Sequence, residues 1–463
     1  MRIANSIPKT LCIGLLALPA VASFAAPTVT SISAGYAHVL FVESDGSMWG
    51  MGYTGDGELG QGFVLILTNY PIQILASNVN TVAAGLNHSL FLETDGSLWA
   101  MGDNTYGELG DGMIANHYFP EKIVPSGVTT ISAGGQFSLY RTVTGHPITT
   151  IALWGMGRNI FDELGVGTIY DGTNVPVLCQ STQFILDEVV AFDAGNYSSF
   201  VIREDGSLWA TGLDSFGELG DGHGITPENP EEIVSNSVLA VSSGTYHTLF
   251  IKNDGGLWAM GADKSGQLGD NTNVLHRIPE QVGVNAMAIA AGGAHSLFIK
   301  ADGSLWGMGS NGVGQVGDGT TIDRHVPVQI VSSNVVAVAA GDQYSLFVKS
   351  DGSLWGMGDN TYGQLGDGSF NAQHAPIRIV PPPPSPAITN LTLSGNNVVL
   401  SGTNGMSGGT YYTLMSTNMA LPRAQWTAIA TNVLDADGGF IITAANAANR
   451  AAGQQFFIIQ LAY

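Results

Sequence analysis

Seven tryptophans divide most of this chain into repeats of similar length and sequence. They follow one another at intervals of 48 to 55 residues, at Trp49, Trp99, Trp154, Trp209, Trp258, Trp306 and Trp355. An aliphatic residue stands ten positions after each tryptophan, and a glycine stands 14 positions before six of them. In the third repeat the glycine stands 20 positions before, which indicates a six-residue insertion. Spacing that is rigid within units but variable between them predicts that each unit packs as one object.

Each repeat predicts four short β-strands. In the last repeat they are residues 336–341, 345–349, 353–358 and 376–380. Asp351-Gly352 joins the second strand to the third, and this dipeptide suits a two-residue hairpin with positive φ. The strands are apolar on both faces, which is typical of sheets stacked between neighbouring sheets. Seven four-stranded units predict an all-β fold, a seven-bladed β-propeller.

A Glu/Gln-Leu-Gly signature follows the third strand of each repeat, with valine in place of leucine in the sixth. A glycine precedes the signature in six repeats, and Asp162 takes its place in the third. Aspartate tolerates a left-handed backbone better than most residues, so we expect one conformation in all seven repeats.

These motifs together resemble the repeat of the regulator-of-chromosome-condensation family. The shared pattern is AGxxHSLFxxxDGSLWxMGxNxxGQLGDG, and it covers roughly residues 28–380. The resemblance implies a seven-bladed propeller. Members of that family include a eukaryotic guanine-nucleotide exchange factor that binds a small GTPase and chromatin. Exported bacterial members are similar in repeat, and some inhibit enzymes such as β-lactamases by covering them.

The chain ends suggest further segments around the propeller, which we place at 27–380. Residues 1–25 have a basic start and an apolar run too short to span a bilayer, which predicts a signal peptide and export to the periplasm, cell surface or medium. Residues 381–386 form a proline-rich linker. Residues 387–463 alternate like strands with Asn/Gly turns, which predicts a small immunoglobulin-like β-sandwich.

The net charge limits the classes of partner, and the cysteine content limits the disulfides that the chain can form. The formal net charge of −22 disfavours nucleic acid and anionic lipid. No segment after the leader predicts a membrane span. One cysteine, Cys179, remains beyond the leader, so no intramolecular disulfide is expected, and we interpret it as buried and inert.

The repeated residues indicate structure rather than catalysis. We interpret the tryptophans as packing between blades, and the repeat-position histidines (His38, His88, His247 and His295) as strand-start residues that bond neighbouring backbone. Those histidines stand on separate blades, so they predict no metal site. The loop DNTYGELGDG lacks calcium-loop spacing. We expect no cofactor and no metal, and no nucleophile or phosphate-binding motif occurs.

The variable loops after the third strand are the predicted partner surface. The first repeat carries the apolar run Phe63, Val64, Leu65, Ile66 and Leu67 there, and such a run often marks a contact. Residues 27–240 hold 24 acids against 4 bases, and residues 241–380 hold 11 against 7. The Glu/Gln position of the signature is an acid in repeats one to four, at Glu58, Glu108, Glu163 and Glu218. Further acids of the loops include Asp111 and Asp221. These patterns predict a basic partner on this end.

The sequence therefore predicts an exported, non-catalytic propeller that binds another macromolecule, with a protein as the first choice. One alternative is a glycan-binding or envelope-binding protein that uses the C-terminal segment. The other is an enzyme whose site is dispersed over several blades. The predicted leader and the acidity disfavour guanine-nucleotide exchange.

Overall fold

The computed structural model describes residues 27–62, 66–145, 150–179 and 188–379, and in the C-terminal part 387–394, 397–403, 410–416, 427–433, 440–444 and 456–461. The predicted leader and the proline-rich linker lie outside the described residues. The chain falls into two compact units, of which one covers Ala26–Pro381 and the other includes Pro382–Tyr463. Each is described by itself.

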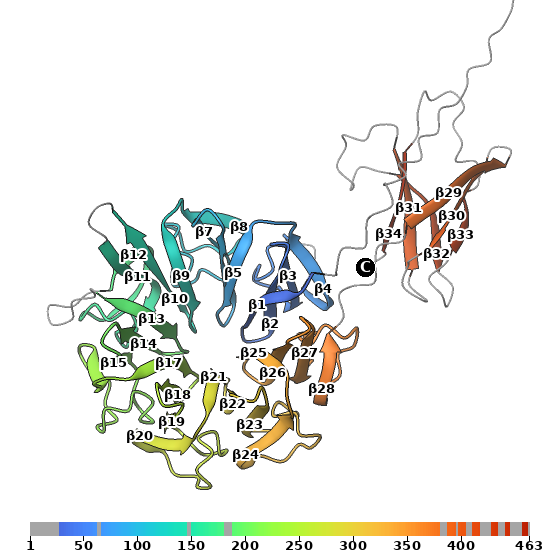
Figure 1. The fold of residues 1–463 in the computed structure, drawn as a ribbon. Helices are drawn as coiled ribbons and strands as arrows, with labels where there is room; N and C mark the ends of the chain where they lie inside the picture. Colours follow the sequence, from blue (N-terminus) through green and yellow to red (C-terminus); the bar gives the residue numbers. More distant parts are fainter. Residues whose placement is uncertain are drawn as a thin grey trace, which may run out of the picture. The chain divides into compact units, whose positions relative to one another are not determined.

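Seven antiparallel sheets of four consecutive strands form a ring (Figure 1), which confirms the predicted seven-bladed propeller. We number these sheets as blades one to seven in chain order. The innermost strands are β1 (Val29–Ala34), β5 (Val79–Ala84), β9 (Val128–Ala133), β13 (Val189–Ala194), β17 (Val238–Ser243), β21 (Ala286–Ala291) and β25 (Val335–Ala340). The second strands are β2 (His38–Glu43), β6 (His88–Glu93), β10 (Phe137–Thr144), β14 (Ser198–Arg203), β18 (His247–Lys252), β22 (His295–Lys300) and β26 (Tyr344–Lys349).

The outer half of each blade has the same order. The third strands are β3 (Met48–Tyr53), β7 (Leu98–Gly102), β11 (Thr150–Asn159), β15 (Leu208–Gly212), β19 (Leu257–Gly261), β23 (Leu305–Gly309) and β27 (Leu354–Gly358). The outermost strands are β4 (Leu67–Leu75), β8 (His117–Val124), β12 (Tyr170–Leu178), β16 (Glu231–Val234), β20 (His276–Gly283), β24 (Arg324–Val331) and β28 (Gln373–Ile379).

Apolar side chains hold each blade to the next. Leu40 and Leu59 of blade one pack with Phe91 and Met101 of blade two in one buried cluster. A similar cluster joins blade seven to blade one, so the ring is closed by packing between complete blades. Burial on both faces of the middle strands explains their continuous apolar sequence.

Ring closure also uses a phenol hydroxyl. In four blades a histidine Nε2 lies within hydrogen-bond distance of a serine Oγ on the next blade, for example 3.0 Å between His38 and Ser89. The sequence had indicated neighbouring backbone as the histidine's partner, so this side-chain partner was not predicted. Blade one has Val39 at the serine position, and there the hydroxyl of Tyr344 reaches backbone oxygens instead, at 2.7 Å from His38 O.

The turn between the second and third strands differs from the predicted two-residue hairpin. In blade one the N–H of Gly46 donates to Glu43 O at 2.8 Å, and the N–H of Glu43 donates to Ser47 O at 3.0 Å. Gly46 has a φ of 81°, whereas Asp45 is not in the positive-φ region. This is a three-residue loop, a type I turn followed by a left-handed glycine. The Asp45 carboxylate accepts the N–H of Ser47 at 2.9 Å, which favours aspartate before the glycine.

The left-handed position before the signature is confirmed. Gly57 has a φ of 100°, and Asp162 has a φ of 61° at the same place in blade three.

The C-terminal unit contains two three-stranded sheets. One has the order β29 (Ala387–Ser394), β30 (Asn397–Thr403), β33 (Phe440–Ala444), and the other has the order β32 (Thr427–Val433), β31 (Thr410–Ser416), β34 (Phe456–Leu461). An immunoglobulin-like sandwich stays a prediction for this unit.

Candidate functional site

The two ends of the ring are built from different connections. Because strands two and three are antiparallel, with His38 opposite Gly52, the turns after the innermost strands and the long loops after the third strands share one end. We call it the loop end. The Asp-Gly turns lie at the other end, which we call the hairpin end. Length and sequence vary most at the loop end, so this is where a binding site can differ between propellers.

The signature acids are not part of the loop-end surface. Their side chains belong to residues at most 3% exposed. In blade one Oε2 of Glu58 accepts the N–H of Asp56 at 3.0 Å, and in blade six Oε1 of Gln315 accepts the N–H of Val313 at 3.1 Å. Glu58 and Gln315 therefore occupy equivalent positions in their blades and accept equivalent hydrogen bonds. The prediction that the signature acids help to form a surface for a basic partner is wrong, because these side chains fold back under their own loops.

Burial also changes the charge of these acids. Loss of hydration raises the pKa of Glu58 to about 8 and the pKa values of Glu108 and Glu218 to about 7. The pKa of Glu163 is raised for the same reason. Near neutral pH a large share of the Glu58, Glu108 and Glu218 carboxyls is protonated, so these acids contribute less negative charge than their number suggests.

The two other predicted acids are also engaged within their loops. The Asp111 side chain is 3% exposed, and its Oδ2 lies 2.7 Å from Nε2 of His117. Oδ1 of Asp221 accepts the N–H of His223 at 2.6 Å. Asp111 is therefore unavailable to a partner, and Asp221 serves its own turn.

Part of the predicted apolar run can be located. Phe63, Val64 and Leu65 lie outside the described residues, while Ile66 is 68% exposed and Leu67 is 36% exposed. The contact predicted for this run stays a prediction, and the long loop of every other blade also exposes an apolar side chain. Beyond blade one they include Ile114 at 67%, Ile169 at 61%, Ile225 at 74%, Val274 at 65%, Ile322 at 63% and Phe370 at 47% exposed.

Aromatic residues gather nearer the centre of the loop end, over blades two to five. Phe216 and Tyr246 have ring centres 4.8 Å apart, and Tyr197 stacks on Tyr246 at 6.1 Å. The Arg158 guanidinium lies 5.3 Å from the centre of the Tyr106 ring and 6.0 Å from that of Tyr197. Tyrosine and arginine of this kind are typical of residues that dominate protein interfaces. We call this group, with Phe161, the aromatic patch.

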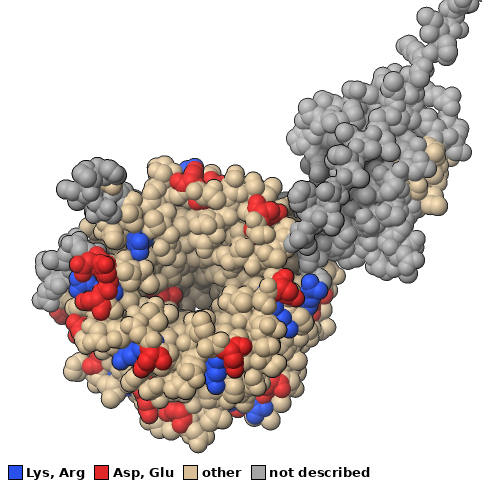
Figure 2. All heavy atoms as spheres, viewed as in Figure 1, with Lys and Arg blue, Asp and Glu red and all other residues tan. Residues whose placement is uncertain are grey.

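A cavity of about 320 Å³ lies in the central channel. It is lined by the ends of the innermost strands and by the turns that follow them, so it lies toward the loop end. Its acids are Asp193 and Asp342, and none of its lining residues is basic. Figure 2 shows one face of the ring, with a central opening and charged side chains distributed around it.

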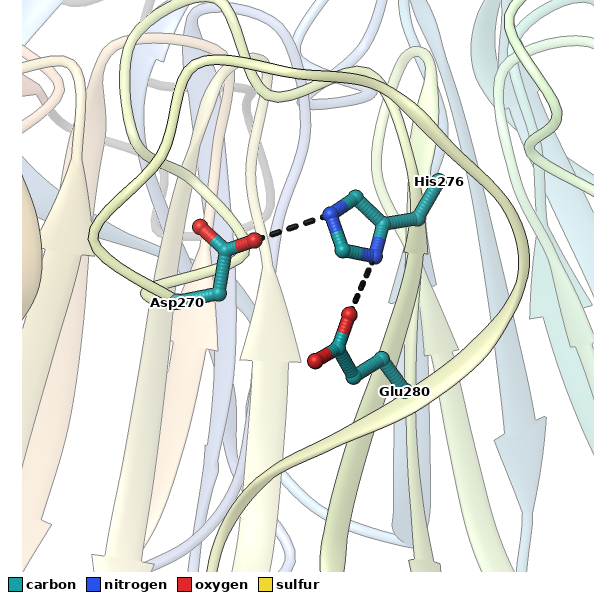
Figure 3. Close-up of side chains that lie close together, drawn as sticks. All are labelled: Asp270, His276 and Glu280. Atoms are coloured by element: carbon teal, nitrogen blue, oxygen red, sulfur yellow. Dashed lines mark ion pairs between the residues drawn. The ribbon is translucent and has the colours of Figure 1, made fainter.

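One cluster has the residue types of a metal centre, and Figure 3 shows its arrangement. Nε2 of His276 lies 2.8 Å from Oδ2 of Asp270, and Nδ1 lies 2.7 Å from Oε2 of Glu280. Both ring nitrogens of His276 are thus directly paired with carboxylates. The same arrangement recurs in blade two around His117. The repetition favours an ion pair that ties the long loop to the outermost strand over a metal site.

The seven repeat tryptophans lie in the third strands of the blades. In six blades the indole stacks on a second-strand aromatic ring, for example Trp49 on Phe41 at 6.4 Å and Trp355 on Phe347 at 6.1 Å, whereas Trp209 lies opposite Val201. Trp99 packs against the cluster between blades one and two. In five blades the indole N–H donates to a serine two residues earlier, at 3.0 Å for Trp99 and Ser97, and in blade three the Trp154 N–H donates to Thr142 at 3.0 Å. These contacts assign the indoles to the fold.

Two further observations concern the reactivity of the cysteine and the possibility of a membrane span. Cys179 is buried, and burial raises the pKa of its thiol, which disfavours the reactive thiolate. Among the described residues, no helix has the length and apolar character needed to cross a bilayer.

The tyrosines that lie beside the channel opening were missed by the sequence reasoning. Tyr36 follows Gly35 in the turn after β1, Tyr53 is the last residue of β3, and Tyr362 lies in the loop after β27; all three positions differ between the repeats. Variation at these repeat positions was the one sequence signal for them, whereas their grouping at the opening is visible only in the assembled ring.

Comparison with known proteins found matches to three family models. The model of the RCC1-like domain matches residues 149–413. Two models of the regulator of chromosome condensation (RCC1) repeat match residues 79–108 and 95–140. No curated protein matched the sequence.

Solved structures share the fold. Prp20p from Saccharomyces cerevisiae, described with its binding to Gsp1p and histones, is 20% identical with a TM-score of 0.62, over 74% of this chain and 87% of that chain. Yeast RCC1 (Prp20) bound to Kap60 is 18% identical with a TM-score of 0.62, over 80% of this chain and 88% of that chain. At this identity the likeness establishes the propeller fold alone.

Proposed function

Because the chain belongs to the RCC1-like domain family, we propose that it is a non-catalytic interaction module whose loop end binds a protein partner. One observation carries the proposal. The loop end presents an exposed apolar side chain from every blade around the aromatic patch and a channel opening. Isolated apolar residues are ordinary on a protein surface, whereas a ring of them around aromatic and arginine side chains fits a protein interface.

The structural relatives support this choice of ligand class. Prp20p is described with protein partners, namely Gsp1p, histones and Kap60. This chain is proposed to bind a different partner, because the predicted leader places it outside the compartment where nucleotide exchange operates. Export to the periplasm, cell surface or medium is part of the proposal.

Affinity capture from the native envelope or medium tests the proposal, with two matched variants. Ile225 is 74% exposed in the loop end of blade four, and Leu239 is 59% exposed near the hairpin end of blade five. We expect Ile225→Asp to lose a specific captured protein and Leu239→Asp to retain it. Capture of the same protein by both variants would place the interface elsewhere.

Two further outcomes would overturn the function itself. Binding to a glycan array that disappears when residues 387–463 are deleted would assign the activity to the C-terminal unit. A purified chain that turns over a substrate would make it an enzyme.

A further inference from the structure

Tyrosines and aspartates lie beside the channel opening over blades seven and one. Tyr36 follows β1 and is 43% exposed, and Asp342 follows β25 in the lining of the cavity. Tyr53 and Tyr362 contact edge to face with ring centres 5.5 Å apart. We call Tyr36, Tyr53 and Tyr362, with Asp56, Asp342 and Asp359, the tyrosine–acid arc.

The acids of this arc influence the tyrosines. Burial raises the pKa of the Tyr36 phenol, and negative charge on Asp342 and Asp359 raises it further. Burial and the charge of Asp56 act in the same way on the pKa of Tyr53. Carboxylates and phenol rings therefore lie within electrostatic reach of one another, with no basic side chain among the groups that perturb these tyrosines.

The cavity below the arc extends the negative region. Oδ2 of Asp193 accepts the N–H and the hydroxyl of Ser243 at 2.7 and 2.6 Å, and no described residue bonds its other oxygen. The Asp342 carboxylate lies over Gly293, where a Cβ would come within 2.4 Å of Oδ1. Small residues thus leave space in the channel, and the Asp342 carboxyl lines it, whereas burial raises the pKa of Asp193 and limits the negative charge that this second acid carries.

A cationic side chain has the complementary chemistry. Lysine and arginine bind carboxylates, and their charged heads are attracted to tyrosine ring faces. Their long apolar stems suit a narrow channel lined by alanine, glycine and serine. The net charge of the chain would also attract a basic partner toward it.

We propose that the tyrosine–acid arc and the adjoining channel bind a lysine or arginine side chain presented by a basic segment of the protein partner. This inference rests on the proposed function and names the chemistry of its partner. It moves the basic contact from the predicted repeats one to four to the junction of blades seven and one.

The test measures binding of a fluorescein-labelled hexa-arginine peptide by fluorescence anisotropy at low and high salt. The double variant Asp342→Asn/Asp359→Asn removes two negative charges from the arc. The control double variant Asp302→Asn/Asp351→Asn removes two from the hairpin end of blades six and seven, where both aspartates are in exposed turns. We expect Kd to rise about tenfold for the arc variant and less than twofold for the control, because each partly exposed charge pair changes affinity a few-fold.

Equal weakening by both double variants would show that the peptide follows net charge alone, and an unchanged arc variant would overturn the inference. Asp359 also accepts a hydrogen bond from Gln364. If the double variant has a lower melting temperature than the parent chain, the single variant Asp342→Asn replaces it in the test. The expected rise in Kd is then about threefold, and an unchanged Kd would overturn the inference.

Failure of this inference is distinguishable from failure of the proposed function. A captured protein that the arc double variant still binds at full strength removes the arc and leaves a protein-binding loop end. If no protein is captured, the proposed function is refuted, regardless of whether the hexa-arginine peptide binds.

Discussion

Replacing Glu58 by glutamine should stabilise the propeller in a pH-dependent way. The Glu58 side chain is 0% exposed, and burial raises its pKa from 4.5 to about 8. A raised pKa in the folded state means that the folded chain holds this proton more tightly than the unfolded chain. The stability is therefore fully present below about pH 4.5 and is lost as pH rises toward 8.

The magnitude follows from that interval. Each pH unit between the two pKa values changes the free energy of unfolding by about 1.4 kcal/mol, which gives about 3 kcal/mol at pH 7. Glutamine removes this loss and keeps the hydrogen bond, as Gln315 shows in blade six. We expect Glu58→Gln to match the parent chain at pH 4.5 and to exceed it by about 3 kcal/mol at pH 7.

The assay is urea unfolding of both chains across pH 4.5 to 8. Four buried histidines act in the opposite direction, since burial lowers the pKa values of His38 and His295 to about 3 and those of His88 and His247 to about 4. The difference between the two chains isolates Glu58 from that background. Glu228→Gln, at an exposed position, is the control for loss of one charge. An equal gain in the free energy of unfolding at pH 4.5 and pH 8, or no gain at either pH, would refute the claim that the buried Glu58 carboxyl is neutral in the folded chain.

Three substitutions test the packing, and one truncation tests the independence of the propeller. Trp258→Ala should cost roughly 3 kcal/mol, because the ring stacks on Phe250 at 6.0 Å and packs between blades four and five; an unchanged melting temperature with lost binding would make this tryptophan a binding residue. Gly256→Ser should gain about 1 kcal/mol in thermal unfolding, because the buried Trp258 N–H has no partner where other blades supply a serine hydroxyl; destabilisation would mean that the side chain does not fit. Tyr344→Phe should cost about 1 kcal/mol by removing the ring-closing hydroxyl, and a melting curve that coincides with the parent's would show that packing alone closes the ring. A chain ending at residue 384 should keep the melting transition of the propeller, because its last strand ends at Ile379, and aggregation of that chain would show that the C-terminal unit is required.

Repeat spacing was sufficient to predict the blades because it reflects packing that every blade must satisfy. The four strands and the left-handed residue before the signature are local consequences of that packing. The turn type was misjudged because Asp-Gly suits two hairpin geometries, and the Asp45 side-chain bond to Ser47 decides between them.

The candidate site was less predictable, because charge in a sequence does not reveal burial. The exchange of Glu58 for Gln315 at one repeat position was interpreted as a charge gradient. It instead marks a buried hydrogen-bonding position where acid and amide are equivalent. Exposure at the loop end depends on how seven separate loops meet, so Tyr36 and the aromatic patch emerged only from the assembled ring.

Hydrogen–deuterium exchange of the chain with its captured protein partner tests the central claim most directly. The loop-end account predicts slower exchange in the long loops, such as 103–116 and 213–226, and in the turns after the innermost strands. Exchange in the Asp-Gly turns and in residues 387–463 should stay unchanged. Protection confined to the hairpin end or to the C-terminal unit would contradict the account.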